Sequence, residues 1–275
     1  MIDTHVHVYT PETIRDWEKI AEHEEYFGTL AGSKVQKWAT ADDVLAAMDE
    51  DGIDESWICG FGFNDLGRCR ETNDYVLEAC ARSARRLRPL CVVPPLARGA
   101  EAEIVRCAAR GAIGVGELFP DGQMWCVDDA RETWRLAAAC HENGLFLLVH
   151  AAEPVGRNYA GKGRTGPREL YQLARNHPEL RIQMAHLGGG LFMYESMKDV
   201  AVDLLNVHYD IAALPFLYDA RMLRAAMEIV PRKLLYGSDF PILRYPRYWA
   251  AIEGALGAEE RMALLSANAT RMLTG

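Results

Sequence analysis

Residues 144–150, with the sequence GLFLLVH, contain the clearest indication of the fold. Gly144 is expected to end a helix, because glycine adopts the left-handed conformation of a helix C-terminus without steric cost. The run from Leu145 to Val149 is apolar throughout and does not alternate, which is typical of a strand covered on both faces. His150 is the first polar residue after it. The stretch therefore predicts a buried parallel strand that ends in a histidine.

The same pattern recurs outward from this stretch in both directions. The eight predicted strands are Ile2–Val8, Glu55–Gly60, Leu90–Pro94, Ile113–Leu118, Leu145–His150, Arg181–His186, Val207–Ala213 and Lys233–Asp239. Periodicity of 3.6 residues predicts helices at Ala41–Asp51, Thr72–Arg86, Ala100–Arg110, Asp128–Asn143, Pro167–Asn176, Glu195–Asp203, Ala220–Val230, Pro246–Leu256 and Ala258–Leu273. Gly52 and Gly111 resemble Gly144 as helix ends, and Thr72 and Asp128 are the predicted N-caps.

Eight strands that each precede a helix predict an α/β fold, a single (β/α)8 TIM barrel over residues 1–275 with an extra C-terminal helix. A doubly wound open sheet is the alternative, but no GxGxxG motif follows the first strand. Residues Thr10 to Thr40 form a long insertion between the first strand and its helix. Such an insertion is either a lid over the barrel mouth or a surface excursion with a small core of its own.

Composition excludes several classes of protein. The net charge is −9 and no basic track is present, which disfavours nucleic acid as a partner. No apolar run is long enough to span a membrane, and the start MIDTHVHVYT does not resemble a signal peptide. The seven cysteines include no CxxC pair, which favours buried thiols in a reducing compartment over disulfides. We therefore expect a cytoplasmic protein; the sequence leaves its oligomeric state open, and a homodimer is compatible with it.

Polar residues gather where the predicted strands end. His5 and His7 are two positions apart on one strand, so both side chains point to the same face. The other strand-end candidates are Glu117, His150, His186 and Asp239. Because functional side chains of a TIM barrel meet at the C-terminal ends of its strands, these six should converge. Burying two carboxylates and four imidazoles together is costly without a cation, so we expect a divalent metal site.

The order of the motifs DTHVH, GVGEL, GSDFP and NATRML resembles the amidohydrolase superfamily. The branch it resembles is the "amidohydrolase 2" set of metal-dependent hydrolases, which includes relatives of aminocarboxymuconate semialdehyde decarboxylase. The resemblance runs from Asp3 to Leu273. It implies that one metal is held by His5, His7 and Asp239, and a second by His150 and His186.

The resemblance implies that Glu117 bridges two such metals: many binuclear relatives use a carboxylated lysine as the bridge, but none of the six lysines lies at the C-terminal end of a predicted strand. Mononuclear decarboxylase-like relatives imply a different arrangement. There His5, His7, His150 and Asp239 would hold one zinc, and His186 would act in catalysis. Zinc is the first expectation for the metal, and nitrogen and oxygen ligands also admit manganese or iron.

The predicted function is a metal-dependent hydrolase that attacks an amide or lactone carbonyl with a metal-activated water, with Asp239 and His186 as catalytic residues. The alternative is a mononuclear zinc decarboxylase or hydratase of an unsaturated carboxylic acid. A TatD-like phosphodiesterase is disfavoured by the acidic charge. A barrel kept only as a binding module is disfavoured by the complete ligand set.

A polar, glycine-rich loop follows His150 and supplies candidate contacts for a small, anionic substrate. These candidates are Arg157, Asn158, Tyr159 and Lys162. Arg244, five residues after Asp239, is a further candidate carboxylate anchor. The alternatives are a flexible surface connection for the loop and a surface arginine for Arg244. Asp210 is given no chemical role.

Overall fold

The computed structural model describes residues 1–274 and consists of one parallel barrel. The strands are β1 (Ile2–His7), β2 (Glu55–Cys59), β3 (Leu87–Cys91), β4 (Gly114–Leu118), β5 (Phe146–Val149), β6 (Ile182–Met184), β7 (Val207–Asp210) and β8 (Leu234–Leu235). They pair in parallel and in chain order from β1 to β8. The backbone N–H of Thr4 donates to the carbonyl of Tyr236, and that of Asp239 donates to His5, which joins the two edges. The predicted (β/α)8 barrel is confirmed.

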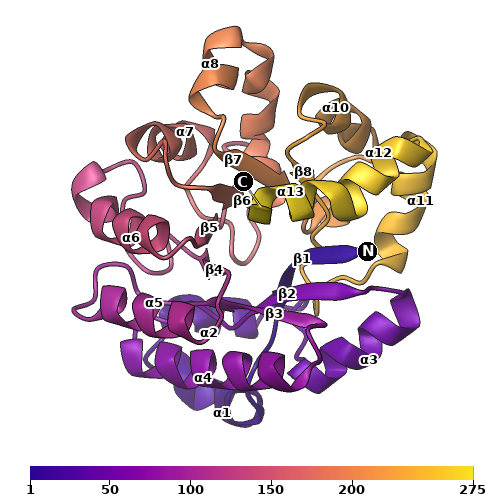
Figure 1. The fold of residues 1–275 in the computed structure, drawn as a ribbon. Helices are drawn as coiled ribbons and strands as arrows, with labels where there is room; N and C mark the ends of the chain where they lie inside the picture. The colour runs from indigo at the N-terminus through magenta and orange to yellow at the C-terminus, as the bar shows by residue number, and fades with distance from the viewer. Residues whose placement is uncertain (275) are drawn as a thin grey trace.

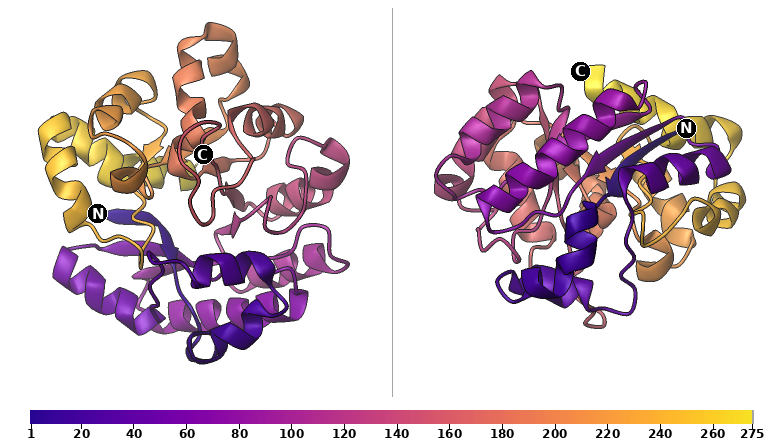
Figure 2. Two further views of the ribbon diagram at one scale, coloured as in Figure 1. Left: turned by 180° about the vertical axis from the view of Figure 1, so that it is seen from behind. Right: turned by 90° about the horizontal axis from the view of Figure 1, so that it is seen from below.

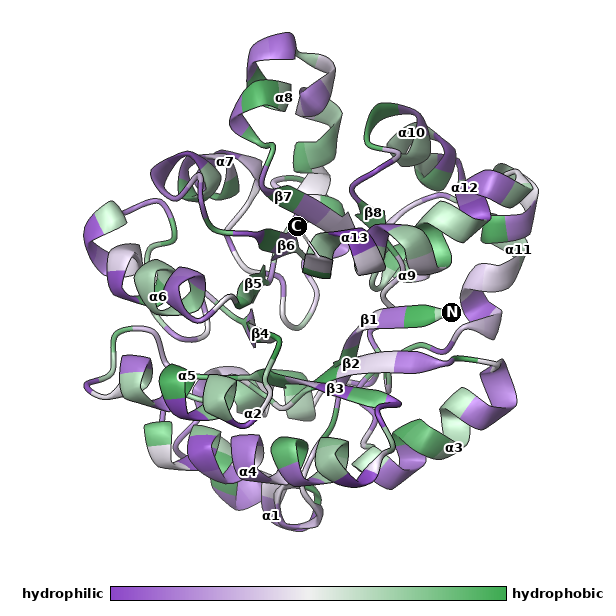
Figure 3. Ribbon diagram, in the orientation of Figure 1, coloured by the Kyte–Doolittle hydropathy of each residue, from purple (hydrophilic) through white to green (hydrophobic). Residues whose placement is uncertain are grey.

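Helices surround the strands on the outside (Figure 1). Those after β1 are α1 (Pro11–Ala21), α2 (Glu25–Ala31), α3 (Ala41–Asp51), α4 (Leu66–Arg82), α5 (Ala100–Ala109), α6 (Ala130–Glu142), α7 (Pro167–Asn176), α8 (Lys198–Asp203), α9 (Leu214–Leu217), α10 (Arg221–Ile229) and α11 (Pro246–Ala255). The chain ends in α12 (Ala258–Met262), a π-helical turn η2 (Ala263–Ala267) and α13 (Asn268–Thr274). Figure 3 shows that both the helices and the strands carry hydrophobic and hydrophilic residues. None of the helices within residues 1–274 has the length and apolar character that a membrane span needs.

The helix ends follow the expected chemistry at their C-termini more closely than at their N-termini. Gly52 and Gly144 both have φ near +70°, as the predicted left-handed caps require. The predicted N-cap Thr72 is wrong: α4 begins at Leu66, where the side chain of Asp65 accepts from the Arg68 N–H. The N-cap of α6 lies one residue after the predicted Asp128, at Asp129.

The insertion after β1 contains two helices, α1 and α2. They protrude at the end of the barrel opposite to the end where both termini lie (Figure 2). Phe27 of α2 is buried and its ring contacts the rings of Phe61 and Phe63, with centroids 5.1 Å apart in each pair. The insertion thus has an apolar core that is continuous with the barrel mouth. It covers the mouth, as a lid would, but its buried contacts hold it in place against the barrel.

The segment after β6 departs from the prediction. A 3-10 segment, η1 (His186–Ser196), precedes α8 where one helix Glu195–Asp203 was expected. Residues 186–190 all have positive φ. A Cβ atom at Gly189 would lie 2.3 Å from the carbonyl oxygen of Ala152, so only glycine allows the two backbones to approach this closely. The glycine run therefore fixes the chain beside the end of β5.

Candidate metal centre

The six strand-end residues predicted to meet do meet, at the C-terminal end of the barrel. All are buried, with at most 9% of any one exposed. The Nε2 atoms of His5 and His7 face one another at 3.1 Å, and Asp239 Oδ1 lies 3.6 Å from His7 Nε2. Within residues 1–274, suitably spaced donor atoms form two triads: His5, His7 and Asp239 in one, and Glu117, His150 and His186 in the other.

The carboxylate of Glu117 lies between the four imidazoles. Its Oε2 is 3.3 Å from His5 Nε2 and 3.1 Å from His7 Nε2. Its Oε1 is 2.9 Å from His150 Nδ1 and 3.7 Å from His186 Nε2. This buried acid therefore contacts both triads and supplies negative charge at the position where the imidazole nitrogens converge.

The outer nitrogens of three histidines have partners outside the centre. His5 Nδ1 donates to Asp210 Oδ2 at 2.9 Å, and His186 Nδ1 donates to the Ala212 carbonyl at 2.9 Å. His7 Nδ1 lies 3.5 Å from the sulfur of Cys59. Such outer contacts are the usual support of metal-binding histidines, because they place the proton on one nitrogen and leave the other free to bind. The donor set therefore fits a divalent cation.

His150 is arranged differently. Its Nδ1 contacts Glu117, and its Nε2 donates to the carbonyl of Gly161 at 3.1 Å. The Tyr26 hydroxyl donates to the same carbonyl at 2.8 Å. The loop between β5 and α7 thus meets the insertion helix α2 directly above the centre, and together they limit access of solvent.

Burial and charge act in opposite directions on the groups of the centre. Burial lowers the pKa of His5, but the carboxylates of Glu117 and Asp210 outweigh it and hold that pKa well above its usual value. Burial likewise opposes the charge on Glu117, yet His5 and His150 hold the pKa of that carboxyl well below its usual range. The pKa of His150 is raised, because the attraction of Glu117 exceeds the effect of burial. The arrangement favours protonated imidazoles around an ionised carboxylate when no metal is bound.

An aromatic wall, formed by Phe119, Phe61 and Tyr26, stands beside the centre. The ring of Phe119 lies 6.4 Å from His7 and 5.4 Å from His150, centroid to centroid. Phe61 stacks on Phe119 at 4.9 Å, and Tyr26 lies 5.5 Å from it. None of the three was a predicted site residue, because an aromatic side chain that lines a site looks the same in sequence as one that packs in the core.

Asp210 and Cys59 were also missed. Each is the last residue of its strand in the structure, β7 and β2, but the predicted strands continued to Ala213 and Gly60, so neither residue marked a predicted strand end. Their role as partners of His5 and His7 depends on contacts between residues 205 and 52 positions apart. Those contacts form only because the fold brings distant strands together, so the sequence alone does not reveal them.

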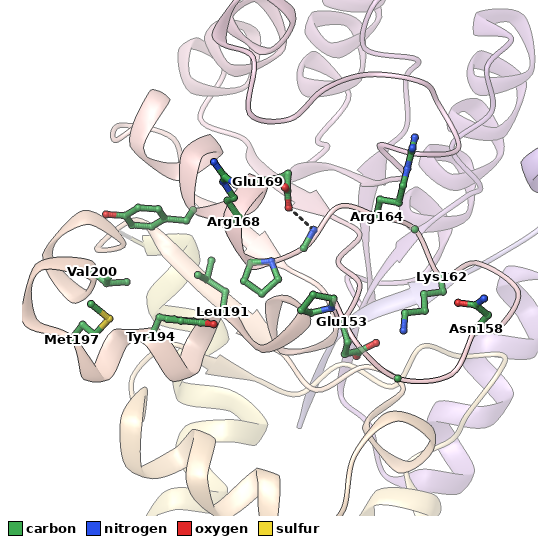
Figure 4. A pocket seen from close by; sticks show the side chains of 16 residues that line it. Glu153, Asn158, Lys162, Arg164, Arg168, Glu169, Leu191, Tyr194, Met197 and Val200 are labelled. Atoms are coloured by element: carbon green, nitrogen blue, oxygen red, sulfur yellow. Dashed lines mark hydrogen bonds between the residues drawn. The ribbon is translucent and has the colours of Figure 1, made fainter.

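Within residues 1–274, none of the predicted substrate-binding side chains forms a hydrogen bond with a candidate metal ligand. A cavity of about 870 Å³ lies between the β5–α7 loop and η1. Asn158 and Lys162 line it from one side (Figure 4). Tyr159 donates to Glu153, and the Lys162 ammonium donates to the carbonyl of Val155 within the loop. Arg157 lies on the exposed part of this loop, where its carbonyl accepts from Lys162.

Arg244 is held elsewhere. Its guanidinium donates to Asp51 at 2.7 and 2.9 Å and to Glu50 at 2.9 Å, and both acids lie at the end of α3. That helix end leads into the start of β2, at the end of the barrel opposite to the metal centre. The structure therefore does not bring Arg244 to the site.

The sequence profile of the family described as amidohydrolase matches residues 2–274, and the chain belongs to this family. A comparison with curated proteins finds no match. Solved structures similar to it include a 5-carboxyvanillate decarboxylase from Sphingomonas paucimobilis, with 16% identity, coverage of 100% of this chain and 98% of that chain, and a TM-score of 0.77. A 2,6-dihydroxybenzoate decarboxylase in complex with 2,6-dihydroxybenzoate has 18% identity, coverage of 100% and 99%, and a TM-score of 0.73.

A third similar structure is a dihydroxybenzoic acid decarboxylase from a Polaromonas species, with bound manganese and the inhibitor 2-nitroresorcinol. It has 18% identity, coverage of 99% of this chain and 96% of that chain, and a TM-score of 0.72. These likenesses and the two triads support a divalent metal in this fold. The prediction of amide or lactone hydrolysis is wrong by this comparison, because the activity named for all three structures is decarboxylation.

Proposed function

We propose that the chain is a metal-dependent decarboxylase of a small aromatic carboxylic acid. The observation that carries the proposal is the arrangement of the buried centre. The Nε2 atoms of His5 and His7 face inward beside Glu117, and the ring of Phe119 lies against His7. A carboxylate group at the centre would place its attached ring against the aromatic wall, where offset or edge contacts between rings are favourable.

One cation per chain, held by His5, His7 and Asp239, is the arrangement we propose. In the described part of the chain, no group outside the centre contacts the Nε2 atoms of His5 and His7, whereas Nε2 of His150 donates to the carbonyl of Gly161. The ion would supply positive charge that holds an anionic substrate and stabilises charge developing on it. Zinc is our first choice for the ion, and manganese, which is present in three similar structures, is the second.

The reaction consumes one proton: the bond between ring carbon and carboxyl carbon breaks, carbon dioxide leaves, and the ring carbon gains hydrogen. We assign the supply of that proton to His186. Its Nδ1 is fixed as a donor to Ala212, so Nε2, which faces Glu117, is the nitrogen that exchanges protons with the centre. Glu117 lies near enough to His186 and His150 to accept or return protons between turnovers.

Closure of the site serves this chemistry. The contact of Gly161 with both His150 and Tyr26 keeps bulk water away, which strengthens electrostatic interactions in the centre. Arg157, Asn158, Tyr159 and Lys162 stay as predicted substrate contacts, because their loop carries Gly161 and would order around a bound acid. An anionic small molecule remains the proposed substrate class.

The test is the release of carbon dioxide from a panel of hydroxylated and carboxylated benzoic acids. Protein stripped with a chelator and reloaded with zinc or manganese should release it, with one metal bound per chain. In D2O, one deuterium should appear at the vacated ring carbon. His186→Gln should lose activity, while His177→Gln, which changes a histidine bonded to Thr133 far from the centre, should keep it. No release from any acid by the loaded protein contradicts the proposal.

A further inference from the structure

Asp210, at the end of β7, is a buried carboxylate to which the reaction proposed above gives no part. Its side chain is fully buried, and its carboxylate oxygens accept every hydrogen bond that the side chain makes within residues 1–274. Oδ2 accepts from His5 Nδ1 at 2.9 Å and from Gln183 Nε2 at 2.7 Å. Oδ1 accepts from the backbone N–H groups of His186 and Ala212, each at 3.0 Å. Four donors around one buried acid match the four lone pairs of an ionised carboxylate.

These contacts connect the two triads of the centre. His5 belongs to the triad with His7 and Asp239, and its ring is held directly. His186 belongs to the triad with Glu117, and it is held twice: Asp210 binds its backbone, and Ala212, itself bound by Asp210, accepts from its ring. The Asp210 carboxylate therefore fixes one histidine in each of the two triads.

Gln183 determines which partner holds the proton in the hydrogen bond between Asp210 and His5. Its Nε2 donates both to Asp210 Oδ2 and to the Thr4 hydroxyl, at 3.2 Å, so the amide is oriented from two sides. Since this amide presents only N–H groups to Asp210, the carboxylate must act as the acceptor. The proton shared with His5 then stays on His5 Nδ1, and His5 Nε2 is left to face the centre. Consistent with this, the pKa of Asp210 lies below its usual value, because the attraction of His5 outweighs the effect of burial.

We propose that Asp210 is a positioning residue that fixes the tautomer of His5 and the backbone of His186, and so raises the affinity of the centre for a divalent cation. This inference rests on the proposed metal site and does not depend on which reaction the site performs. It assigns to Asp210 no contact with substrate or metal.

Replacing Asp210 by asparagine should change the tautomer of His5. The amide oxygen can keep the contacts with His186 and Ala212, and the amide nitrogen then faces His5 Nδ1. Two donors cannot face one another, so His5 must move its proton to Nε2. That nitrogen points to His7 and would present N–H where a ligand lone pair is needed.

The experiment measures zinc binding by calorimetry to wild type, Asp210→Asn and Glu103→Gln. Glu103 is the matched control, because it is an equally buried carboxylate that accepts from Asn73 and Arg106, away from the centre. Loss of an outer-shell partner lowers metal affinity by about 10- to 100-fold, and we expect that range for Asp210→Asn and no change for Glu103→Gln. Nitrogen-15 NMR of the histidines supplies an independent readout of the His5 tautomer.

Each outcome decides a different point. Equal zinc affinity of wild type and Asp210→Asn overturns the inference and leaves the metal site intact. No zinc binding by wild type overturns the metal site, and the inference falls with it. If Asp210→Asn does not fold, the His5 tautomer measured by nitrogen-15 NMR on zinc-loaded wild type still tests the inference. A proton on His5 Nδ1 supports the inference, and a proton on Nε2 overturns it.

Discussion

Replacing Glu117 by glutamine should remove a pH dependence from the stability of the metal-free protein. Glu117 is the principal cause that raises the pKa of His150 and one of two carboxylates that raise that of His5, both against the effect of burial. A histidine whose pKa is raised on folding stabilises the fold fully below its unfolded pKa of about 6.5, and this stability is lost as pH rises through the folded value. Wild type should therefore lose stability above pH 6.5.

The magnitude follows from proton linkage. Each imidazole that holds an extra proton in the folded state lowers the free energy of unfolding by about 1.4 kcal/mol per pH unit. His7 is one such imidazole: contacts with Cys59 and Glu117 outweigh the effect of burial and raise its pKa to about 10, so it alone gives a loss of about 3 kcal/mol between pH 7 and pH 9. Glu117→Gln should be the less stable protein at pH 7, because its imidazoles lack the carboxylate, and its profile should be shallower. The two proteins should approach one another by pH 9.

The assay is urea unfolding followed by circular dichroism at pH 7, 8 and 9, with chelator present. Glu103→Gln is the control, since Glu103 accepts from Arg106 and contacts no histidine of the centre; it should keep the wild-type slope. Parallel profiles for wild type and Glu117→Gln would refute the reasoning. They would show that the carboxylate does not hold protons on these histidines.

Three further predictions concern the metal and the residues around it. Asp239→Asn should keep the wild-type circular dichroism spectrum and lose decarboxylation by about 100-fold or more, since outer-shell losses alone reach that size; retained turnover would remove Asp239 from the ligand set. Zinc at 100 times its dissociation constant should stabilise wild type by about 2.7 kcal/mol, which raises the melting temperature by roughly 5 °C or more and is reversed by chelator. Arg244→Gln should cost about 1–3 kcal/mol in urea unfolding, because Asp51 loses its partner, and leave kcat/KM unchanged; a large rise in KM would restore Arg244 as a substrate anchor.

The barrel could be predicted from sequence because its strands are buried on both faces. Residues 145–149 are apolar without interruption, and β5 (Phe146–Val149) occupies that run. The eighth strand, predicted at Lys233–Asp239, is shorter in the structure. Only Leu234 and Leu235 form its ladder, and the chain then reaches Asp239 through irregular backbone that is held by single hydrogen bonds to β1. Those bonds join residues more than 230 positions apart, and no local pattern encodes them.

The candidate ligands could be predicted because strand ends are local features. Their partners could not. His150 looks equivalent to His186 in sequence, yet Gly161 engages one of its nitrogens and Ala212 engages the opposite nitrogen of His186. The reaction was likewise beyond the sequence, since the same donors suit hydrolysis and decarboxylation. The aromatic wall that supports the proposed decarboxylation could not be predicted either, because its rings come from three separate parts of the chain.

Anomalous diffraction from a crystal loaded with manganese tests the central claim most directly. We predict a single strong peak per chain, within bonding distance of Nε2 of His5, Nε2 of His7 and a carboxylate oxygen of Asp239. A peak bound only at other residues, or no peak in a crystal soaked well above the dissociation constant of comparable sites, would contradict it.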